Sequence, residues 1–444
     1  MEACKMAGKT VGERAIAKLG WRPRPGQAEA VSELINAMNR KGIIAFLAPT
    51  GAGKSGMSLA AARYLSLTTV IAVPTIQLAE QWKKMLGVRQ SIYGRQNYPC
   101  ELGGTAADAP CIGGIPCLFK QSCTYLKARH ECSKSIEFVT THAFLLAATL
   151  AHDPIVQGRL TIIDESHLWE KTVEESLTPS DQERSLLALY PTSGQIKSAI
   201  KEAAEAGDRA RIMALARMLK IALAYEQGVL KDGIVNHEAL LRQYRKALLM
   251  SATVPDWQVA LADRTVRMGM EIPEKQRPIF VQPVGALTGD NCVAYAEVIA
   301  TAVERIAERH RGTGIVHTGN TRLAEAVANE LRKRLNGRVI TAFGKGRTEA
   351  IETARLGGDK IIVSPSMTMG VDFAAAKWQV VAKVPFPKKG NGSLEDAVTN
   401  FVQAYGRLVR SPEATGVTYV LDANFRLLED HLPEHVRRAV FWMK

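Results

Sequence analysis

Residues 48–55 carry the chemistry most easily recognised in this chain of 444 residues. They read Ala-Pro-Thr-Gly-Ala-Gly-Lys-Ser, and they lie between an apolar run and a segment with a helical pattern. Glycines in such a loop let backbone N–H groups surround a phosphate, and the N-terminus of the next helix adds partial positive charge. We therefore expect a nucleoside triphosphate to bind here. Its phosphates would lie against Thr50, Gly51, Ala52 and Gly53, while Lys54 would reach the β- and γ-phosphates and Ser55 would ligate Mg²⁺.

An acidic pair, Asp164 and Glu165, directly follows the apolar residues Leu160–Ile163. In open parallel sheets ligands bind at the carboxyl ends of strands, where this pair would lie. We expect Asp164 to hold Mg²⁺ through its water shell and Glu165 to orient or deprotonate the attacking water. A lone Asp-Glu pair is usually a solvated strand end. Together with the phosphate loop, it predicts hydrolysis of the nucleotide.

Far along the chain, Gln403, Arg407 and Arg410 lie on a segment with a helical pattern. Two arginines three positions apart share one face of a helix. Phosphoryl transfer is assisted by cations at the developing charge, often an arginine from another domain. An isolated arginine pair is normally surface charge. With the other two motifs present, these residues become candidates for that role.

Five of the seven cysteines fall within a stretch, from about Val88 to Ser133, that is rich in Gly and Pro and has little apolar periodicity. Four thiolates in a short segment with little core indicate a metal centre. The candidate ligands are Cys100, Cys111, Cys117 and Cys123. Iron–sulfur, zinc and unligated thiols are the alternatives. We expect Cys132 to be a spare thiol, with replacement of Cys123 as the alternative.

The composition indicates a globular protein, and its basic excess favours a polyanionic partner, with a merely soluble basic protein as the alternative. Hydrophobic residues make up 46% of the chain, and Lys plus Arg exceed Asp plus Glu by 57 to 44. No signal peptide or membrane span is visible, so we expect a cytoplasmic, nucleoid-associated protein with no membrane partner. Aromatic and basic residues interleave around the cysteines, either as a single-strand track or as a basic surface over packed aromatics. These residues are Trp82, Lys83, Lys84, Arg89, Tyr93, Arg95, Phe119, Lys120, Tyr125, Lys127 and Arg129.

Strand and helix patterns alternate in two blocks, which predicts an α/β protein with two parallel sheets. We place the first domain at residues 1–255 and the second at 256–444. Two insertions would interrupt the first domain: a cysteine-rich one at 88–135 and an all-helical one at 170–245.

Several motifs resemble those of superfamily 2 helicases. They are the Asp-Glu-Ser-His box at 164–167, the triplet Ser251-Ala252-Thr253 and the Gln403 to Arg410 helix. Finer details resemble the XPD/DinG branch, namely residues 364–373, 384–387 and 421–426. The resemblance covers nearly the whole chain in the expected order.

This resemblance implies two RecA-like domains that close on ATP. It implies that Gln27 reads the adenine, that Gln403, Arg407 and Arg410 face the γ-phosphate, and that Asp372 couples the nucleotide to the nucleic acid. It also implies a 4Fe–4S cluster on the four cysteines, with zinc as the alternative, and an arch-like role for the helical insertion.

The leading interpretation is therefore an ATP-dependent DNA helicase or translocase that uses Mg²⁺. We expect a monomer that moves 5′-to-3′ on single-stranded DNA and unwinds forked DNA, with RNA as an alternative substrate. One alternative is an ATPase that translocates or remodels nucleoprotein without unwinding. An alternative of another class is a nucleotide-gated nucleic-acid-binding factor.

Overall fold

The structure is a computed structural model that describes residues 9–49, 51–269, 273–335, 337–344, 347–366, 376–386, 394–409 and 414–443. The chain divides into two compact units. The first holds the residues up to Gly269 apart from 49–52, and the second holds those four together with the chain from residue 270 onward.

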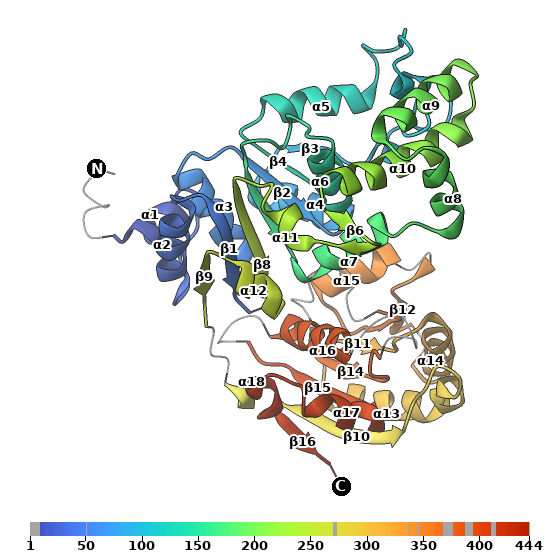
Figure 1. Ribbon diagram of the computed structural model, residues 1–444. Helices are drawn as coiled ribbons and strands as arrows, with labels where there is room; N and C mark the ends of the chain where they lie inside the picture. Colours follow the sequence, from blue (N-terminus) through green and yellow to red (C-terminus); the bar gives the residue numbers. More distant parts are fainter. Residues whose placement is uncertain are drawn as a thin grey trace. The chain divides into compact units, whose positions relative to one another are not determined.

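The first unit is built on a seven-stranded sheet in which all neighbouring strands run parallel (Figure 1). Its order is β3-β4-β2-β5-β8-β1-β9. The strands are β1 (Gly42–Leu47), β2 (Thr69–Val73), β3 (Gln90–Ser91), β4 (Glu137–Thr141), β5 (Leu160–Asp164), β8 (Lys246–Ser251) and β9 (Arg264–Arg267). Because β9 pairs with β1, this unit extends beyond the sequence-based boundary at residue 255.

Helices cover both faces of this sheet, which explains why β2 and β5 are buried along their whole length. On one face, Ile163 and Leu249 pack with residues of the helices α6 and α7. The helices that follow or precede the strands are α1 (Val11–Ala17), α2 (Gln27–Met38), α3 (Lys54–Tyr64), α4 (Ile76–Leu86), α6 (His142–Leu150), α7 (His167–Leu177) and α12 (Asp256–Leu261).

The cysteine-rich insertion contains little regular structure before its final helix. Its elements after β3 are the 3₁₀ turns η2 (Arg95–Asn97) and η3 (Pro110–Gly113) and the helix α5 (Thr124–Lys134). It packs on the second insertion, because Ile112 and Ile115 contact the apolar cluster of α9 and α10. A Cβ atom on Gly113 would lie 2.9 Å from the Ile200 carbonyl oxygen, so this close approach requires glycine.

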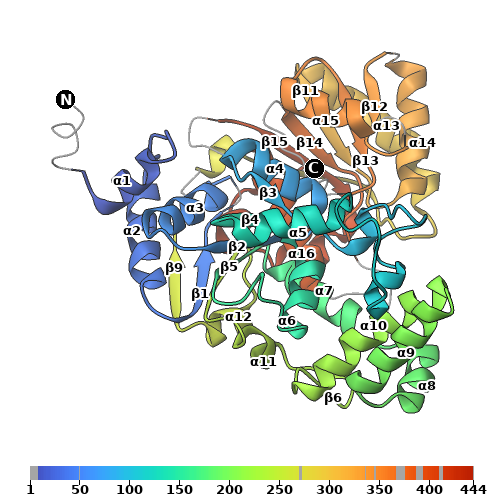
Figure 2. The same cartoon turned by 90° about the horizontal axis from the view of Figure 1, so that it is seen from above.

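The second insertion is mainly helical, and α8, α9 and α10 gather into one bundle in Figure 2. Its elements are α8 (Asp181–Leu189), α9 (Ser193–Glu205), α10 (Arg209–Glu226), β6 (Leu230–Lys231), β7 (Ile234–Val235) and α11 (His237–Leu241). The prediction that it is all-helical is wrong, because β6 and β7 form an antiparallel hairpin. Its turn residues Asp232 and Gly233 have φ of 52° and 78°, as a type I′ turn requires.

The second unit repeats the architecture, with seven parallel strands in the order β12-β13-β11-β14-β15-β10-β16. Val380 packs with the residues of α13 and α14, whereas its neighbour Val381 packs with Phe401 of α16 on the opposite face. The strands are β10 (Ile279–Gly285), β11 (Thr313–His317), β12 (Val339–Thr341), β13 (Ile361–Ser364), β14 (Ala376–Val381), β15 (Val417–Asp422) and β16 (Val440–Trp442).

The helices of this unit are α13 (Ala296–Arg309), α14 (Thr321–Arg334), α15 (Arg347–Leu356), α16 (Leu394–Leu408), α17 (Arg426–Glu429) and α18 (Glu434–Arg437), with the 3₁₀ turns η4 (Glu274–Gln276), η5 (Cys292–Tyr295) and η7 (Ala423–Phe425). The α/β class with two parallel sheets, as expected from the sequence, is confirmed. Among the described residues, no helix has both the length and the apolarity that a bilayer span needs.

Candidate nucleotide and metal sites

Three sequence motifs of the first unit meet at one edge of its sheet. The strands β5, β8 and β1 are direct neighbours. Their register pairs Asp164 with Met250 and Leu47 with Ser251. Because the strands are parallel, the acidic pair, the Ser251 triplet and the start of the phosphate loop all follow the same, carboxyl edge. This is the edge at which such sheets bind ligands.

The phosphate loop takes the backbone conformation that its glycines allow. Gly51 and Gly53 have φ of 82° and 86°, which side chains rarely adopt. Gly53 is the N-cap of α3, which begins at Lys54. The Lys54 ammonium donates to the Ala48 carbonyl at 2.9 Å, and the Ala52 N–H donates to the Pro49 carbonyl at 3.1 Å. Thr50, which the sequence also predicts to bind phosphate, lies outside the described residues.

Gln27 lies beside this loop, at the first position of α2. Its side-chain oxygen accepts the Arg24 N–H at 2.9 Å. A Cβ atom on Gly53 would lie 2.9 Å from the Gln27 amide nitrogen, so the amide closely approaches the loop. That position is compatible with the adenine-reading role that the resemblance implies.

The Asp164 carboxylate is buried and has two donors on one oxygen. Ser55 donates to Oδ2 at 3.4 Å, and the Trp82 indole N–H donates to it at 2.9 Å. Burial first, and then the charge of Glu165, raise the pKa of Asp164, while the Trp82 hydrogen bond lowers it. A divalent cation would favour the ionised form. The Ser55 hydroxyl and the Asp164 carboxylate therefore form a pair of oxygen ligands suited to Mg²⁺.

Glu165 belongs to a small polar network with His167 and Ser251. His167 Nδ1 lies 2.8 Å from Ser251 Oγ, and that hydroxyl donates to Glu165 Oε2 at 3.4 Å. Ser251 Oγ also accepts the Thr253 N–H at 3.1 Å. Glu165 also has φ of 52°, an uncommon conformation for a non-glycine residue. The two motifs that follow β5 and β8 are thus joined by hydrogen bonds.

The four predicted metal-ligating cysteines line a single cavity of about 120 Å³. Arg95, Phe119 and Tyr125 contribute to its wall. Burial and the neighbouring cysteines Cys117, Cys100 and Cys123 raise the pKa of the Cys111 thiol, although Arg95 opposes this. The fold therefore brings together thiols that are up to 23 positions apart in the sequence, as a shared ligand requires.

Cys132 differs from these four. It is fully buried on α5, and burial raises the pKa of its thiol to about 12. It packs in the main apolar core of the first unit, with Phe138 and Val139 of the adjoining strand also buried. A thiol in that environment behaves as a small apolar side chain.

The interleaved aromatic and basic residues do not all form a nucleic-acid surface. Trp82 is 2% exposed and bonded to Asp164, so its assignment to a single-strand track is wrong. Tyr125 is also buried, beneath the Arg95 guanidinium, and Arg129 pairs with Asp153. Phe119 and Lys120 are exposed. The alternative interpretation, an aromatic packed beneath a basic residue, fits Tyr125 and Arg95.

The structure describes only part of the motif that runs from Gln403 to Arg410. Gln403 is buried on α16, and Arg407 belongs to the same helix, which ends at Leu408. Arg410 and Asp372 lie outside the described residues. The roles predicted for these residues toward the γ-phosphate and in coupling stay predictions.

Comparisons with known proteins agree with this arrangement. Residues 21–196 match the family described as "Type III restriction enzyme, res subunit". A structure named "XPD_Helicase" is 14% identical, with a TM-score of 0.59 over 95% of this chain and 99% of that chain. Xpd4 of S. tokodaii is also 14% identical, with a TM-score of 0.56 over 95% and 100%. The DEAD-box helicase Mss116 bound to ssRNA and UDP-BeF is 15% identical, with a TM-score of 0.55 over 100% and 80%. No curated protein matches the sequence.

These similarities define the fold of the chain. The chain has the fold of these helicase structures, and the expectation of two RecA-like domains is confirmed. The matched family spans both the phosphate loop and the acidic pair.

Proposed function

We propose that this protein is an ATP-dependent DNA helicase or translocase that moves 5′-to-3′ on single-stranded DNA and unwinds duplex DNA. The arrangement of Ser55, Asp164 and Glu165 at one sheet edge is the observation that carries the proposal. It combines a phosphate loop, a magnesium ligand and a water-activating carboxylate.

In the proposed hydrolysis each of these side chains has a separate role. Lys54 would neutralise the charge that develops on the β- and γ-phosphates, and Ser55 with Asp164 would hold Mg²⁺. Glu165 orients the attacking water and accepts its proton. Gln403, Arg407 and Arg410 would supply the further polar and cationic groups when the two domains close on ATP.

The hydrogen bonds of Ser251 support a route from hydrolysis to movement. A change at Glu165 alters the environment of the Ser251 hydroxyl, which also holds the Thr253 N–H. The segment that follows Thr253 leads into α12 and β9, so nucleotide state can be transmitted to the chain that enters the second unit.

We propose that Cys100, Cys111, Cys117 and Cys123 hold a 4Fe–4S cluster. The four thiols line one cavity, and thiolates are the usual ligands of such clusters. Zinc, which four thiolates also bind, is the alternative. When bound, the cluster would cross-link this segment through four covalent bonds.

Strand displacement on duplexes with 5′ or 3′ overhangs tests the proposal. Unwinding from the 5′ overhang alone is the expected result, and it requires ATP. Single-stranded DNA should stimulate ATP hydrolysis, which Lys54→Ala should abolish. Lys41→Ala is the matched control, because this lysine precedes β1 and is exposed. ATP turnover that DNA and Lys54→Ala leave unchanged would contradict the proposal.

Two other outcomes correspond to the alternative functions. Stimulated ATP hydrolysis without strand displacement would indicate a translocase or nucleoprotein remodeller. ATP-dependent DNA binding without turnover would indicate a nucleotide-gated binding factor. RNA in place of DNA, in the same assays, identifies the preferred nucleic acid.

A further inference from the structure

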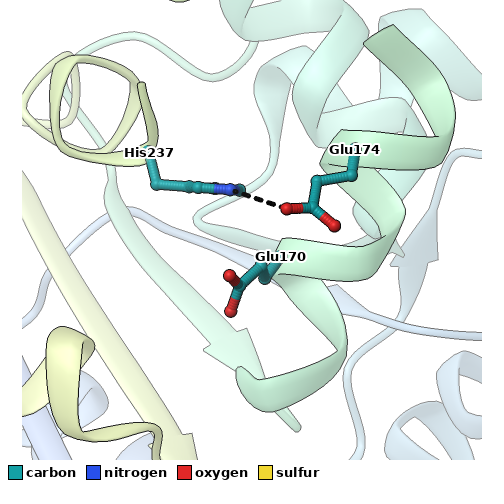
Figure 3. Close-up of side chains that lie close together, drawn as sticks. All are labelled: Glu170, Glu174 and His237. Carbon is teal, nitrogen blue, oxygen red and sulfur yellow. Dashed lines mark ion pairs between the residues drawn. The ribbon is translucent and has the colours of Figure 1, made fainter. Parts of the chain in front are cut away.

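A second group of metal-ligating side chains lies apart from the cysteines. It consists of Glu170 and Glu174 on α7 and His237 at the start of α11 (Figure 3). The glutamates are four positions apart, so they share one face of α7. One ligand atom from each residue lies within 4.8 Å of the other two. In Figure 3 the His237 ring edge points at Glu174, with the Glu170 carboxylate beside them.

The distances suit an ion better than a hydrogen bond. His237 Nε2 and Glu174 Oε1 are 3.7 Å apart, beyond the usual hydrogen-bond range. Two ligands of a tetrahedral zinc ion, at roughly 2.0–2.2 Å from the metal, lie roughly 3.4 Å from each other. A small inward movement of two side chains would therefore bring both atoms onto one ion.

Neighbouring side chains position His237 and Glu170, two of the three candidate ligands. His237 Nδ1 is buried and has no hydrogen-bond partner among the described residues, so Nε2 is the nitrogen that faces the cluster. The Trp257 indole N–H donates to Glu170 Oε2 at 2.8 Å, and its ring packs on the His237 ring at 5.2 Å. One tryptophan thus orients both residues, as outer-shell partners of metal ligands do.

Within the described part of the chain, no lysine or arginine forms an ion pair with this group. Among the ion pairs of the described residues, neither Glu170 nor Glu174 has a lysine or arginine partner. The next carboxylate on the same helix, Glu175, does pair with Lys171. Glu174 is 54% exposed, so an ion can enter from its side. Two carboxylates beside an imidazole form a site of net negative charge.

We propose that Glu170, Glu174 and His237 bind a divalent transition ion of the zinc type, with water in the fourth position. Imidazole and carboxylate are ligands that zinc accepts, and three protein ligands leave one position open. The site lies at the root of the second insertion, because α7 precedes α8 and α11 follows the β6–β7 hairpin. A bound ion would join the helix that follows the Asp-Glu-Ser-His box to the returning end of the insertion.

Zinc binding by the nucleotide-free full chain tests this proposal. Equilibrium dialysis against Zn²⁺ with metal analysis should give one ion fewer for the double variant Glu174→Gln/His237→Asn than for the wild type. Metal on the cysteines is the same in both proteins and cancels in the difference. Glu175→Gln, on the same helix, should bind as the wild type does. Equal stoichiometry in the wild type and the double variant would overturn the proposal.

Two further measurements test the proposal even if the double variant does not fold. Trp257→Phe removes the outer-shell hydrogen bond and should weaken Zn²⁺ binding roughly tenfold or more, while leaving the ligands intact. In the Co²⁺-loaded proteins, the difference spectrum of wild type minus Glu170→Gln should show visible cobalt bands and no sulfur-to-cobalt absorption, because the contribution of the cysteines cancels. Unchanged Zn²⁺ affinity in Trp257→Phe together with unchanged Co²⁺ bands in Glu170→Gln would refute the site.

Discussion

The Trp82 indole N–H donates to the Asp164 carboxylate at 2.9 Å. Trp82 lies on α4, the helix after β2, whereas Asp164 ends β5, the neighbouring strand in the sheet. The hydrogen bond stabilises the ionised carboxylate within a buried site that otherwise raises its pKa. It also aims one carboxylate oxygen at Ser55. Trp82 thus acts as a positioning residue for the proposed magnesium ligand.

Replacing Trp82 with Phe should make the enzyme more dependent on Mg²⁺ at low pH. Loss of the indole donor raises the pKa of Asp164 further, so protons compete better with the cation. A hydrogen bond to a charged group contributes about 1.5–3 kcal/mol, which corresponds to roughly tenfold or more Mg²⁺ for half-maximal ATP hydrolysis near pH 6. Titrating Mg²⁺ at several pH values measures the shift. Trp442→Phe is the matched control, because its indole donates to Glu429 in the second unit.

Ser251→Ala should reduce the stimulation of ATP hydrolysis by DNA more than it reduces ATP binding. The substitution removes the hydroxyl that contacts Glu165, His167 and the Thr253 N–H. Loss of such bonds predicts a roughly three- to tenfold lower stimulated rate. Binding of a fluorescent ATP analogue should stay within about twofold of the wild type.

Ser58→Ala controls for the loss of a buried hydroxyl near the same strand, since Ser58 donates to the Met250 sulfur. It should leave stimulation by DNA intact. An equal loss in Ser58→Ala and Ser251→Ala would assign the effect to packing and not to the polar network.

Substitutions of Cys111 and Cys132 should have opposite effects on the iron content. Cys111→Ser should remove the broad visible absorption of an iron–sulfur cluster and lower the iron content, because Cys111 lines the cavity with the other three thiols. Cys132→Ala should leave both unchanged, because this thiol is buried in the apolar core. Colourless wild-type protein with stoichiometric zinc would contradict the cluster. Loss of iron in Cys132→Ala would contradict the ligand assignment.

The local motifs of the first unit were predictable because each depends on residues close in the sequence. The apolar β1 residues, the glycines 51 and 53 and the start of α3 together define the phosphate loop. The same holds for Asp164 and Glu165 after β5. The turn Asp232-Gly233 also carried a hairpin signal, but two-residue strands are too short for apolar alternation to show.

Contacts between distant segments were not predictable in the same way. The role of Trp82 depends on β2 and β5 being neighbours, yet a signal existed: Ala79, Trp82 and Leu86 recur at helical spacing and form the buried face of α4. The two lysines after Trp82 concealed it by suggesting a basic surface. His237 meets Glu174 only because the second insertion returns to its starting point, which no local pattern encodes.

Because His142 is buried, we expect the folded protein to lose stability in mild acid. It is fully buried at the start of α6, and its Nε2–H donates to the Asp164 carbonyl at 2.9 Å. Burial, and next to it the charge of His167, lower the pKa of His142 to about 4 from an ordinary 6.5. The unfolded chain therefore binds a proton at this residue below pH 6.5, while the folded chain does so only near pH 4.

Stability is consequently unaffected by His142 at neutral pH and falls as the pH drops from about 6.5 to about 4. The full difference is about 3 kcal/mol, from the shift between those two pKa values.

His142→Gln keeps a side-chain amide donor but does not titrate, so its unfolding midpoint should fall less steeply between pH 7 and pH 4.5. His152→Gln is the control, since His152 is exposed on the turn after the same helix. Thermal unfolding of the metal-free and nucleotide-free proteins measures the slopes. Identical slopes for the wild type and His142→Gln would show that the buried imidazole does not govern the acid sensitivity of the first unit.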